Sequence, residues 1–469
     1  MTSAPLLPAD RPAAGTVPVP AGRPYLLRCP VCGEGYQDDG VRLDCAVAHR
    51  PALLRTEYAT AFTPGPGGGP FRYRCWLPVG GRELPRGSGG ATYRAERLGR
   101  VLGLSELWVA FSGYWPERGA DLVTGSFKEL EAQAVLARLP ERPPVLVVAS
   151  AGNTAAAFLR ACSRQGVECV LVVPETALPA LAAAGERADC VRLVTVAGDY
   201  GDAIEVADAI AARPGFQAEG GTRNVARRDG LGTALLNAAE TIGRLPDHYV
   251  QAVGSGAGAI AAHEAARRLL ASGMQGARWP AAGSGALWDR TATLPGRTDG
   301  GAARSGGLPR LTLCQNAAFA PMFHAWRDGL AEPVIGSGQE ARAAVAAAYA
   351  QELTTRRPPY AVAGGVRDVL AESGGELCTA DSSEASAAGR LFADVEGIDI
   401  EPAAAVALAG LRRAVAAGRI RPRETVLLHI TGGGRARRAG GRPPVAVVPD
   451  LRVPAGLGVQ DAAHLVTRA

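Results

Sequence analysis

The fold is decided by a strand, a turn and the start of a helix between Val145 and Thr154, which read VLVVASAGNT. The first five residues form a continuous apolar run, as expected of a strand buried on both faces. The next five are small or polar and open a predicted helix. Because backbone N–H groups are unpaired at the start of a helix, such a turn can bind a carboxylate or a phosphate. An ordinary turn between a strand and a helix fits the pattern equally well.

Alternating strands and helices continue on both sides of this stretch. Short runs of Val and Leu are separated by helical stretches of roughly 10 to 15 residues, which indicates βαβ units and a parallel sheet covered by helices on both faces. The sequence therefore predicts an α/β fold. Strands are predicted at residues 107–111, 145–149, 167–173, 248–253, 311–314 and 425–430, and helices at 126–139, 154–165 and 259–271.

Composition divides the chain into segments. Residues 1–24 are rich in Pro and Ala and are predicted to be disordered, whereas residues 275–309 lack apolar periodicity, as expected of a flexible surface insertion. Residues 436–469 are predicted to be a C-terminal tail of uncertain order. The remaining segments are a short cysteine-bearing part at 25–58, a larger domain at 59–140 and 240–435, and a smaller domain at 141–239.

The bulk composition excludes several classes of protein. A chain of 469 residues that is 47% hydrophobic and 20% charged can bury a large core and form two or three domains. The net charge of +5 is small and the arginines are interspersed with acids, so we expect no nucleic-acid partner. No run reaches the ~18 apolar residues of a membrane span, and the N-terminus lacks the apolar centre of a signal peptide. These features predict a cytoplasmic protein with no membrane partner.

Cysteine and histidine cluster near the N-terminus. Cys29 and Cys32 form a knuckle with Gly33, and Cys45 and His49 follow, so four side chains could complete a tetrahedral Cys3His zinc site. A total of nine cysteines, an odd number in a long chain, argues against a secreted disulfide framework. The alternative is a turn with reduced cysteines and no bound metal.

Lysine is almost absent from the sequence. Among the 50 Lys and Arg residues, Lys128 is the one lysine. Only an amine can lose its proton near neutral pH and attack a carbonyl, so a lysine retained where arginine would supply the same charge suggests Schiff-base chemistry. Ser126 is a predicted N-cap with Glu129 completing a capping box, and an amine in the first helical turn should have a lowered pKa. The alternative is chance survival of one lysine in an ordinary capped helix.

Two further segments each follow a predicted strand. Residues 254–258 read GSGAG and precede an Ala-rich helix, so their backbone amides could surround a phosphate without obstruction by side chains. This segment lacks the opening βαβ unit and the partner acid of a dinucleotide fingerprint. Thr431, followed by three glycines, places a hydroxyl at the end of the last strand or marks the exit of the chain from the sheet.

Taken in chain order, the lone lysine, the Asn-containing turn, the glycine-rich loop and the terminal Thr resemble the fold type II pyridoxal-phosphate enzymes of the tryptophan synthase β family. That resemblance implies two parallel-sheet domains with the cofactor between them. Lys128 would bind pyridoxal 5'-phosphate covalently, Asn153 would bond its phenolic oxygen, and Thr431 its pyridine nitrogen. The cofactor phosphate would be bound by Gly254, Ser255, Gly256, Ala257 and Gly258. The substrate carboxylate would be bound by Ser150, Ala151, Gly152 and Thr154.

Longer stretches narrow the resemblance to threonine synthase and its relative cysteate synthase. The zinc-ribbon-like start and residues 125–128 and 224–232 are similar to threonine synthase, although Glu129 and Leu130 replace the acid-Arg pair that usually follows the lysine. Stretches similar to cysteate synthase lie at residues 111–120, 219–224, 245–249, 397–404 and 430–434.

The resemblance to cysteate synthase implies a β-replacement, in which O-phospho-L-serine loses phosphate to give an aminoacrylate and sulfite then adds to give L-cysteate. A threonine synthase reaction on phosphohomoserine, or a different nucleophile, is the alternative, and an interaction module without catalysis is another. With no second lysine in the chain, the expected ligands of these anions are arginines, helix N-termini or histidines. The candidates are Arg118, Arg223, Arg227 and Arg228, each of which could instead be an ordinary solvated arginine. The family commonly forms homodimers, so a homodimer is expected.

Overall fold

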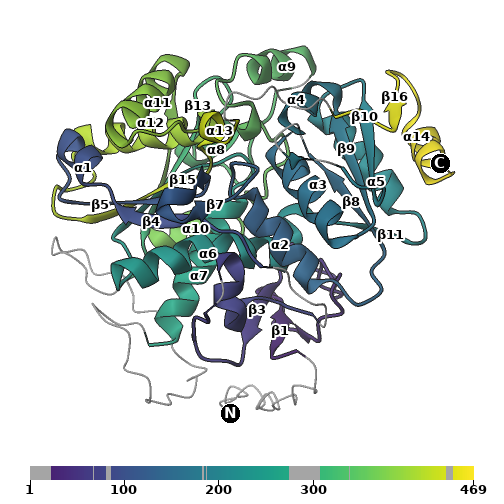
Figure 1. Cartoon of the computed structure of the whole chain (residues 1–469), viewed down its shortest axis with the longest axis horizontal. Coiled ribbons are helices and arrows are strands. Elements are labelled where there is room, and N and C mark those ends of the chain that lie inside the picture. Colours follow the sequence, from purple (N-terminus) through teal and green to yellow (C-terminus); the bar gives the residue numbers. More distant parts are fainter. Residues whose placement is uncertain are drawn as a thin grey trace, which may run out of the picture.

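The computed structural model describes residues 23–468, apart from 67, 81–85, 151, 182–183, 186, 274–306, 337 and 440–446. Most of the predicted disordered N-terminus and of the predicted insertion at 275–309 therefore lies outside the described residues. Two sheets covered by helices form the body of the molecule, and a small antiparallel sheet lies at one end of it (Figure 1). None of the helices in these described ranges is long and apolar enough to cross a membrane.

The larger sheet has six strands, which are β4 (Ala91–Arg94), β5 (Glu106–Phe111), β12 (His248–Ala252), β13 (Arg310–Asn316), β14 (Glu376–Ala380) and β15 (Thr425–Ile430). Their order is β14-β13-β12-β15-β5-β4, and all neighbouring pairs are parallel except β4 with β5. The covering helices are α1 (Glu96–Leu102), α6 (Val225–Ile242), α7 (Ala257–Ala271), α10 (Val366–Ser373), α11 (Ser382–Glu396) and α12 (Pro402–Ala416).

Alternate residues of the larger sheet face two separate helical layers. Tyr249 and Leu427 pack with α6, α7 and α10, whereas Val250 and Leu428 pack with α1, α11 and α12. Burial on both faces explains the continuous apolar runs from which these strands were predicted. Each predicted strand of this sheet is present, with ends that differ from the prediction by at most a few residues.

The smaller sheet has five parallel strands in the order β11-β8-β9-β10-β16. They are β8 (Val145–Ala149), β9 (Cys169–Pro174), β10 (Val191–Val196), β11 (Phe216–Ala218) and β16 (Leu451–Val453). One face is covered by α2 (Lys128–Arg138) and α3 (Asn153–Gln165), and the other by α5 (Tyr200–Ala211) and α14 (Val459–Arg468). In Figure 1, α2 lies in the centre of the molecule, beside the smaller sheet and next to α6 of the larger one.

The C-terminal tail is more ordered than its composition indicated. β16 continues the smaller sheet by pairing with β10, and α14 packs on the same face of that sheet as α5 through Ala462, Ala463 and Val466. The reason is physical: this strand and helix cover apolar surface of β10 and α5 that would otherwise face water.

The capping box predicted at the start of α2 is wrong. Phe127 occupies the cap position without a side-chain capping bond, and Ser126 Oγ has no hydrogen-bond partner among the described residues. Glu129 instead accepts a hydrogen bond from the backbone N–H of Thr124. The start of the helix is held from outside, because the Phe127 N–H donates to the carbonyl of Thr431 at 2.9 Å. Contact with the chain just after β15 therefore replaces the local cap.

Short elements connect the two sheets where their parallel strands end. The hairpin of β6 (Tyr114–Trp115) and β7 (Ala120–Asp121) precedes α2, and α13 (Arg435–Ala439) follows β15. The remaining helices are α4 (Leu178–Leu181), α8 (Pro321–Arg327) and α9 (Gly338–Ala346).

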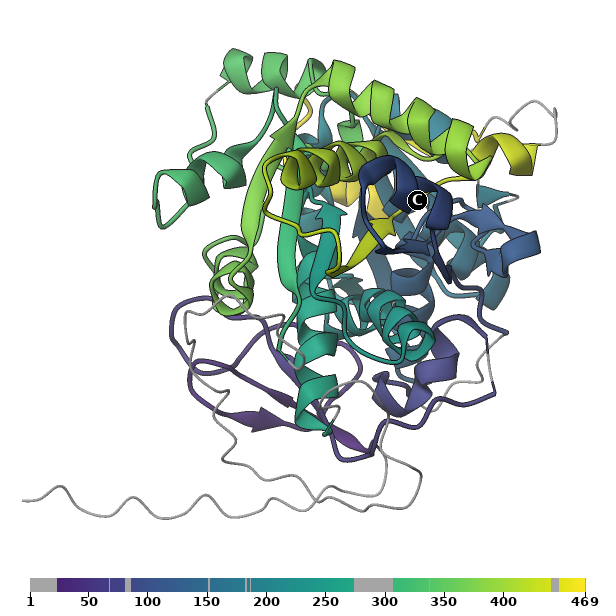
Figure 2. The same ribbon diagram turned by 90° about the vertical axis from the view of Figure 1, so that its left-hand side faces the viewer.

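The small N-terminal sheet is antiparallel and lies at the end of the molecule opposite α11 and α12 (Figure 2). Its strands are β1 (Tyr25–Arg28), β2 (Gly35–Tyr36) and β3 (Arg55–Tyr58). The contact with the rest of the chain includes a buried ion pair at the end of α2, described next.

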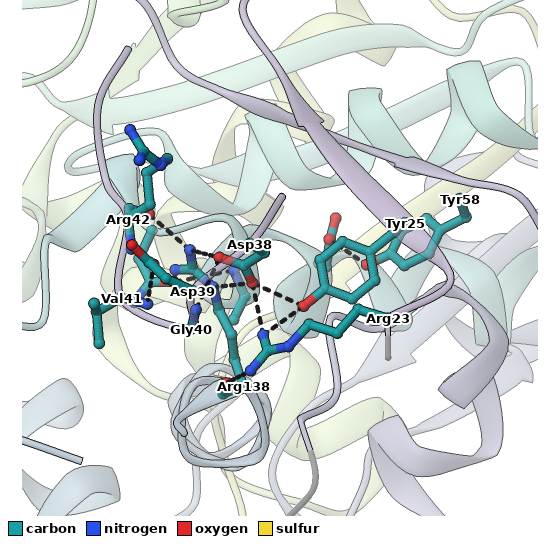
Figure 3. A network of polar contacts seen from close by, with 12 residues as sticks. Arg23, Tyr25, Asp38, Asp39, Gly40, Val41, Arg42, Tyr58 and Arg138 are labelled. Atoms are coloured by element: carbon teal, nitrogen blue, oxygen red, sulfur yellow. Dashed lines mark hydrogen bonds and ion pairs between the residues drawn. The ribbon is translucent and has the colours of Figure 1, made fainter. Parts of the chain in front are cut away.

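The carboxylate of Asp38 ties the N-terminal sheet to α2 and α6 (Figure 3). It accepts hydrogen bonds from Arg138 at 2.9 and 2.7 Å, from Arg23 at 2.8 Å and from the Tyr25 hydroxyl at 2.7 Å. Arg138 also donates to Asn224 Oδ1 at 3.0 Å. Because Asn224 caps α6, one buried ion pair connects three parts of the fold.

Asp38→Asn is expected to lower the free energy of unfolding by about 3–5 kcal/mol, because it leaves the buried guanidinium of Arg138 without its counter-ion. Asp44→Asn is the matched control, since its pair with Arg223 is exposed (56% and 48%) and should contribute about 1 kcal/mol or less. Urea unfolding of both variants measures the difference. Equal losses of stability would show that the Asp38 contact does not join the N-terminal sheet to α2.

Candidate active site

Segments singled out in the sequence meet where the parallel strands end. Phe127, just before α2, is hydrogen bonded to Thr431 at the end of β15. Gly258, in the first turn of α7, lies so close to the Phe127 ring that an added Cβ would be 2.9 Å from it. Asn153, at the start of α3, donates to Glu401, whose carboxylate lies against the chain just after Thr431. The carboxyl ends of parallel strands are the usual location of a ligand site in α/β proteins.

Lys128 is the first residue of α2, and its amine has a largely buried environment. Nζ donates to Glu131 Oε2 at 3.1 Å and lies 4.6 Å from the centre of the Phe127 ring. Burial lowers the pKa of Lys128, although the charge of Glu131 acts in the opposite direction. The lowered pKa predicted from the sequence is thus confirmed, with burial as its main cause.

The carboxylate of Glu131 joins three helices. It is fully buried and receives Lys128 from its own helix, the Thr154 hydroxyl from α3 at 2.9 Å and the Arg227 guanidinium from α6 at 2.8 Å. Arg227 also pairs with the buried Glu219, with Nε 2.9 Å from Oε1. Two cations therefore balance two carboxylates, as buried charges require.

Asn153 belongs to a second polar cluster, of which Glu401 is the buried member. Its Nδ2 donates to Glu401 Oε2 at 2.9 Å, and its Oδ1 accepts from Arg435 at 2.5 Å. Arg435 also forms an ion pair with Glu401. Burial raises the pKa of Glu401 to about 8, against the lowering effect of Arg435. Burial thus favours the neutral form of the carboxyl group beside Asn153, whereas the ion pair with Arg435 favours its ionised form.

The glycine-rich loop allows close approach at the start of α7. Gly256 has a φ of +81°, which L side chains rarely adopt, and an added Cβ would lie 2.3 Å from Val366. At Gly258 an added Cβ would lie 2.6 Å from Gln251 Nε2. Because side chains are excluded there, the loop presents its backbone N–H groups, as an anion site at a helix start requires.

Two backbone N–H groups at the turn after β8 donate hydrogen bonds to the hydroxyl of a serine in the same turn. Ser150 Oγ accepts hydrogen bonds from the N–H groups of Gly152 at 3.2 Å and Ala155 at 3.1 Å. Thr154 is bonded to Glu131, and Ala151 lies outside the described residues. The hydrogen bonds to Ser150 therefore stabilise the turn itself. The same turn is the one expected to bind the substrate carboxylate.

The other three candidate arginines contact aromatic rings or other acids, and not Glu131. Arg118 lies over two aromatic rings, 4.3 and 4.7 Å from their centres. Arg223 forms an exposed ion pair with Asp44 at 2.7 Å, and the buried Arg228 pairs with Glu264 at 3.0 Å. Within the described part of the chain, none of these arginines bonds to a residue that bonds Lys128 or Asn153.

The four candidate metal ligands near the N-terminus lie together. The ligand atoms of Cys29, Cys32, Cys45 and His49 are all within 4.8 Å of one another. Cys29 Sγ is 3.2 Å from His49 Nε2, and Cys32 Sγ is 3.6 Å from Cys45 Sγ. Three sulfurs and one imidazole at this spacing are compatible with a structural zinc ion.

Sequence reasoning missed Glu131, Glu401 and Arg435. Glu131 follows Lys128 by three residues, so helical spacing already placed both on one face of α2. Glu401 precedes Pro402 at the start of α12, which indicates only a helix start. Its contact with Asn153 joins residues 248 apart in the chain, which no local pattern predicts.

Comparisons with known proteins support the same fold and cofactor class. The family model described as pyridoxal-phosphate dependent enzyme matches residues 94–432. A protein of Methanosphaerula palustris named cysteate synthase is 46% identical over 92% of this chain and 95% of that protein, and one of Methanoculleus marisnigri with the same name is 45% identical over 92% and 94%. The structure of threonine synthase from Escherichia coli has a TM-score of 0.52 at 15% identity, covering 78% of this chain and 79% of that one, which is a likeness of fold alone.

Glu131→Gln is expected to lower the pKa of the Lys128 amine further, because it removes the carboxylate that favours the ammonium form. The amine should then react faster with an acylating reagent at a fixed pH, measured by mass spectrometry of the peptide that contains Lys128. Glu129→Gln is the matched control, since its carboxylate bonds Thr124 and Ser88. A slower reaction in Glu131→Gln, or an equal change in both variants, would contradict the assignment.

Proposed function

Because the chain belongs to the family of pyridoxal-phosphate dependent enzymes, we propose that it converts O-phospho-L-serine and sulfite to L-cysteate and phosphate. The observation that supports this proposal most is the position of Lys128, the one lysine of the chain, with a buried amine where the parallel strands end. The relatives named cysteate synthase support the choice of product.

The residues present fit pyridoxal phosphate. Lys128 would hold it through Nζ, the loop at 254–258 would bind its phosphate with backbone N–H groups, and Asn153 and Thr431 would face its ring. The buried hydroxyl of Ser126, which has no partner among the described residues, is one polar atom that such a group could satisfy. When bound, the cofactor supplies an electron sink that makes the Cα proton and the phosphate of the substrate easier to remove.

Lys128 is the proposed general base. Its lowered pKa increases the fraction of neutral amine near neutral pH, so Nζ can accept the proton from the substrate Cα. After that transfer the ammonium group is 3.1 Å from the carboxylate of Glu131, which stabilises its charge. Arg227 forms an ion pair with Glu131 from the other side and holds its carboxylate in place, so we propose that Arg227 acts through Glu131 and does not bind substrate.

The two remaining polar groups orient ligands. We propose that the substrate carboxylate binds at the turn of residues 150–154, because the start of α3 favours an anion. Burial raises the pKa of Glu401 and Arg435 pairs with it, and both effects reduce the repulsion of anionic substrates by this carboxyl group.

We also propose that Cys29, Cys32, Cys45 and His49 bind one zinc ion. The ion would fix the segment that precedes and follows Asp38, and through Asp38 the end of α2. Zinc therefore would stabilise the helix that carries Lys128 without taking part in the reaction.

Purified protein is expected to contain one zinc ion per chain by elemental mass spectrometry. Cys45→Ser should lose the metal and unfold at lower urea concentration, because metal-binding free energy contributes to folding. Cys75→Ser is the matched control, since Cys75 lies outside the ligand group. Folded, metal-free wild-type protein of unchanged stability would contradict the zinc site.

Phosphate release and cysteate formation from phosphoserine and sulfite test the proposed reaction. Lys128→Arg keeps the charge but loses the reactive amine, so turnover should fall about 10³-fold or more while the urea unfolding curve changes little. Phosphohomoserine in the same assay measures the threonine synthase alternative. Phosphate release from phosphohomoserine but not from phosphoserine would overturn the proposed substrate.

A further inference from the structure

A cleft of about 420 Å³ opens between α2, α3 and the β6–β7 hairpin. Neither Lys128 nor Asn153 lines it, so it is separate from the proposed cofactor site. Three arginines line the cleft, namely Arg86, Arg160 and Arg164. The cleft therefore concentrates positive charge beside the helix that begins with Lys128.

The cleft has two carboxylates against three arginines, so the acids offset only part of this charge. Asp121 accepts the N–H of Gly89 at 2.7 Å, and Glu129 accepts that of Thr124. Burial raises the pKa of Glu129, which favours its neutral form. Glu129 forms an ion pair with Arg160, with 3.8 Å between Oε2 and Nε, and Arg160 also donates to the carbonyl of Ala184 at 3.4 Å.

Arginines gather around Arg160 without a matching set of acids. The side chain of Arg160 is only 20% exposed. Burial lowers the pKa of Arg160, and the positive charges of Arg164 and Arg438 lower it further, against the effect of Glu129. Arg86, Arg164 and Arg438 form no side-chain hydrogen bond or ion pair with any residue that the structure describes. Arg86 and Arg164 are exposed and Arg438 is half-buried, so an anion bound beside the largely buried Arg160 would offset the repulsion among these like charges.

We propose that this cleft binds a doubly charged oxyanion, as inorganic phosphate or as the phosphate of a monoester, at a second site beside the one that contains Lys128. The guanidinium groups of Arg160 and Arg164, one turn apart on α3, supply paired N–H donors that match phosphate oxygens. Ser88 and Tyr114 add hydroxyl groups to the lining.

Binding there would also affect the neighbouring site through α13. Arg435, at the start of this helix, bonds Asn153 and Glu401, whereas Arg438, three residues later, adds its charge at Arg160. Arg438 does not line the cleft, so an oxyanion bound by Arg160 and Arg164 would act on α13 by attracting the charge of Arg438. The second site and the Asn153 cluster are thus connected by one short helix.

Calorimetric titration of the cofactor-loaded protein with inorganic phosphate tests the proposal. We expect binding with a dissociation constant of about 1 mM or below, weakened about tenfold or more in the double variant Arg160→Gln/Arg164→Gln, because each charge-assisted hydrogen bond contributes appreciably. Arg412→Gln, which removes an exposed arginine from α12, is the matched control and should bind as the wild type does.

Two further measurements separate this site from the reaction site. The double variant should retain the absorbance band of the bound cofactor and the urea unfolding curve of the wild type, since neither arginine contacts Lys128. Unchanged phosphate affinity in the double variant would place the anion elsewhere and overturn the proposal, as would the absence of phosphate binding to the wild type. Both outcomes are measured without turnover, so they do not depend on the identity of the proposed reaction.

Discussion

The hydrogen bonds to the carboxylate of Glu131 are the constraint on which the rest of the site depends. Lys128, Thr154 and Arg227 reach this group from α2, α3 and α6. A carboxylate buried this completely is stable only with several donors, so the three helices must keep their relative positions. The same contact sets the place of the Lys128 amine and supports it when it carries a proton.

The opposite end of α2 is held in a comparable way. Arg138 is the last residue of α2 and donates hydrogen bonds to Asp38, which lies beside the N-terminal sheet. Arg138 also donates to Asn224, which caps α6. α2 is therefore fixed by a buried ion pair near each end, and α6 participates in both. This arrangement gives the N-terminal sheet a structural function in the protein even though it lies away from the proposed cofactor site.

Much of the fold could be predicted from the sequence, because strands buried on both faces leave continuous apolar runs such as the one at 145–149. The order of the lysine, the turn, the glycine loop and the final Thr also indicated the cofactor class. The features that the sequence did not reveal depend on contacts distant along the chain. The N–H of Phe127 at the start of α2 is bound by Thr431, and the C-terminal tail is ordered where β16 pairs with β10. Glu401 is positioned beside Asn153 by the sheets, so its raised pKa could not be read from its neighbours in sequence.

The central claim is that Lys128 is the residue that holds the cofactor. Borohydride reduction of the cofactor-loaded protein, followed by peptide mapping with mass spectrometry, locates the attached group directly. We predict a single modified peptide, the one that contains Lys128, because this side chain provides the chain's one lysine amine. Modification at the N-terminal amine, or no stable modification of a protein that retains activity, would contradict the claim.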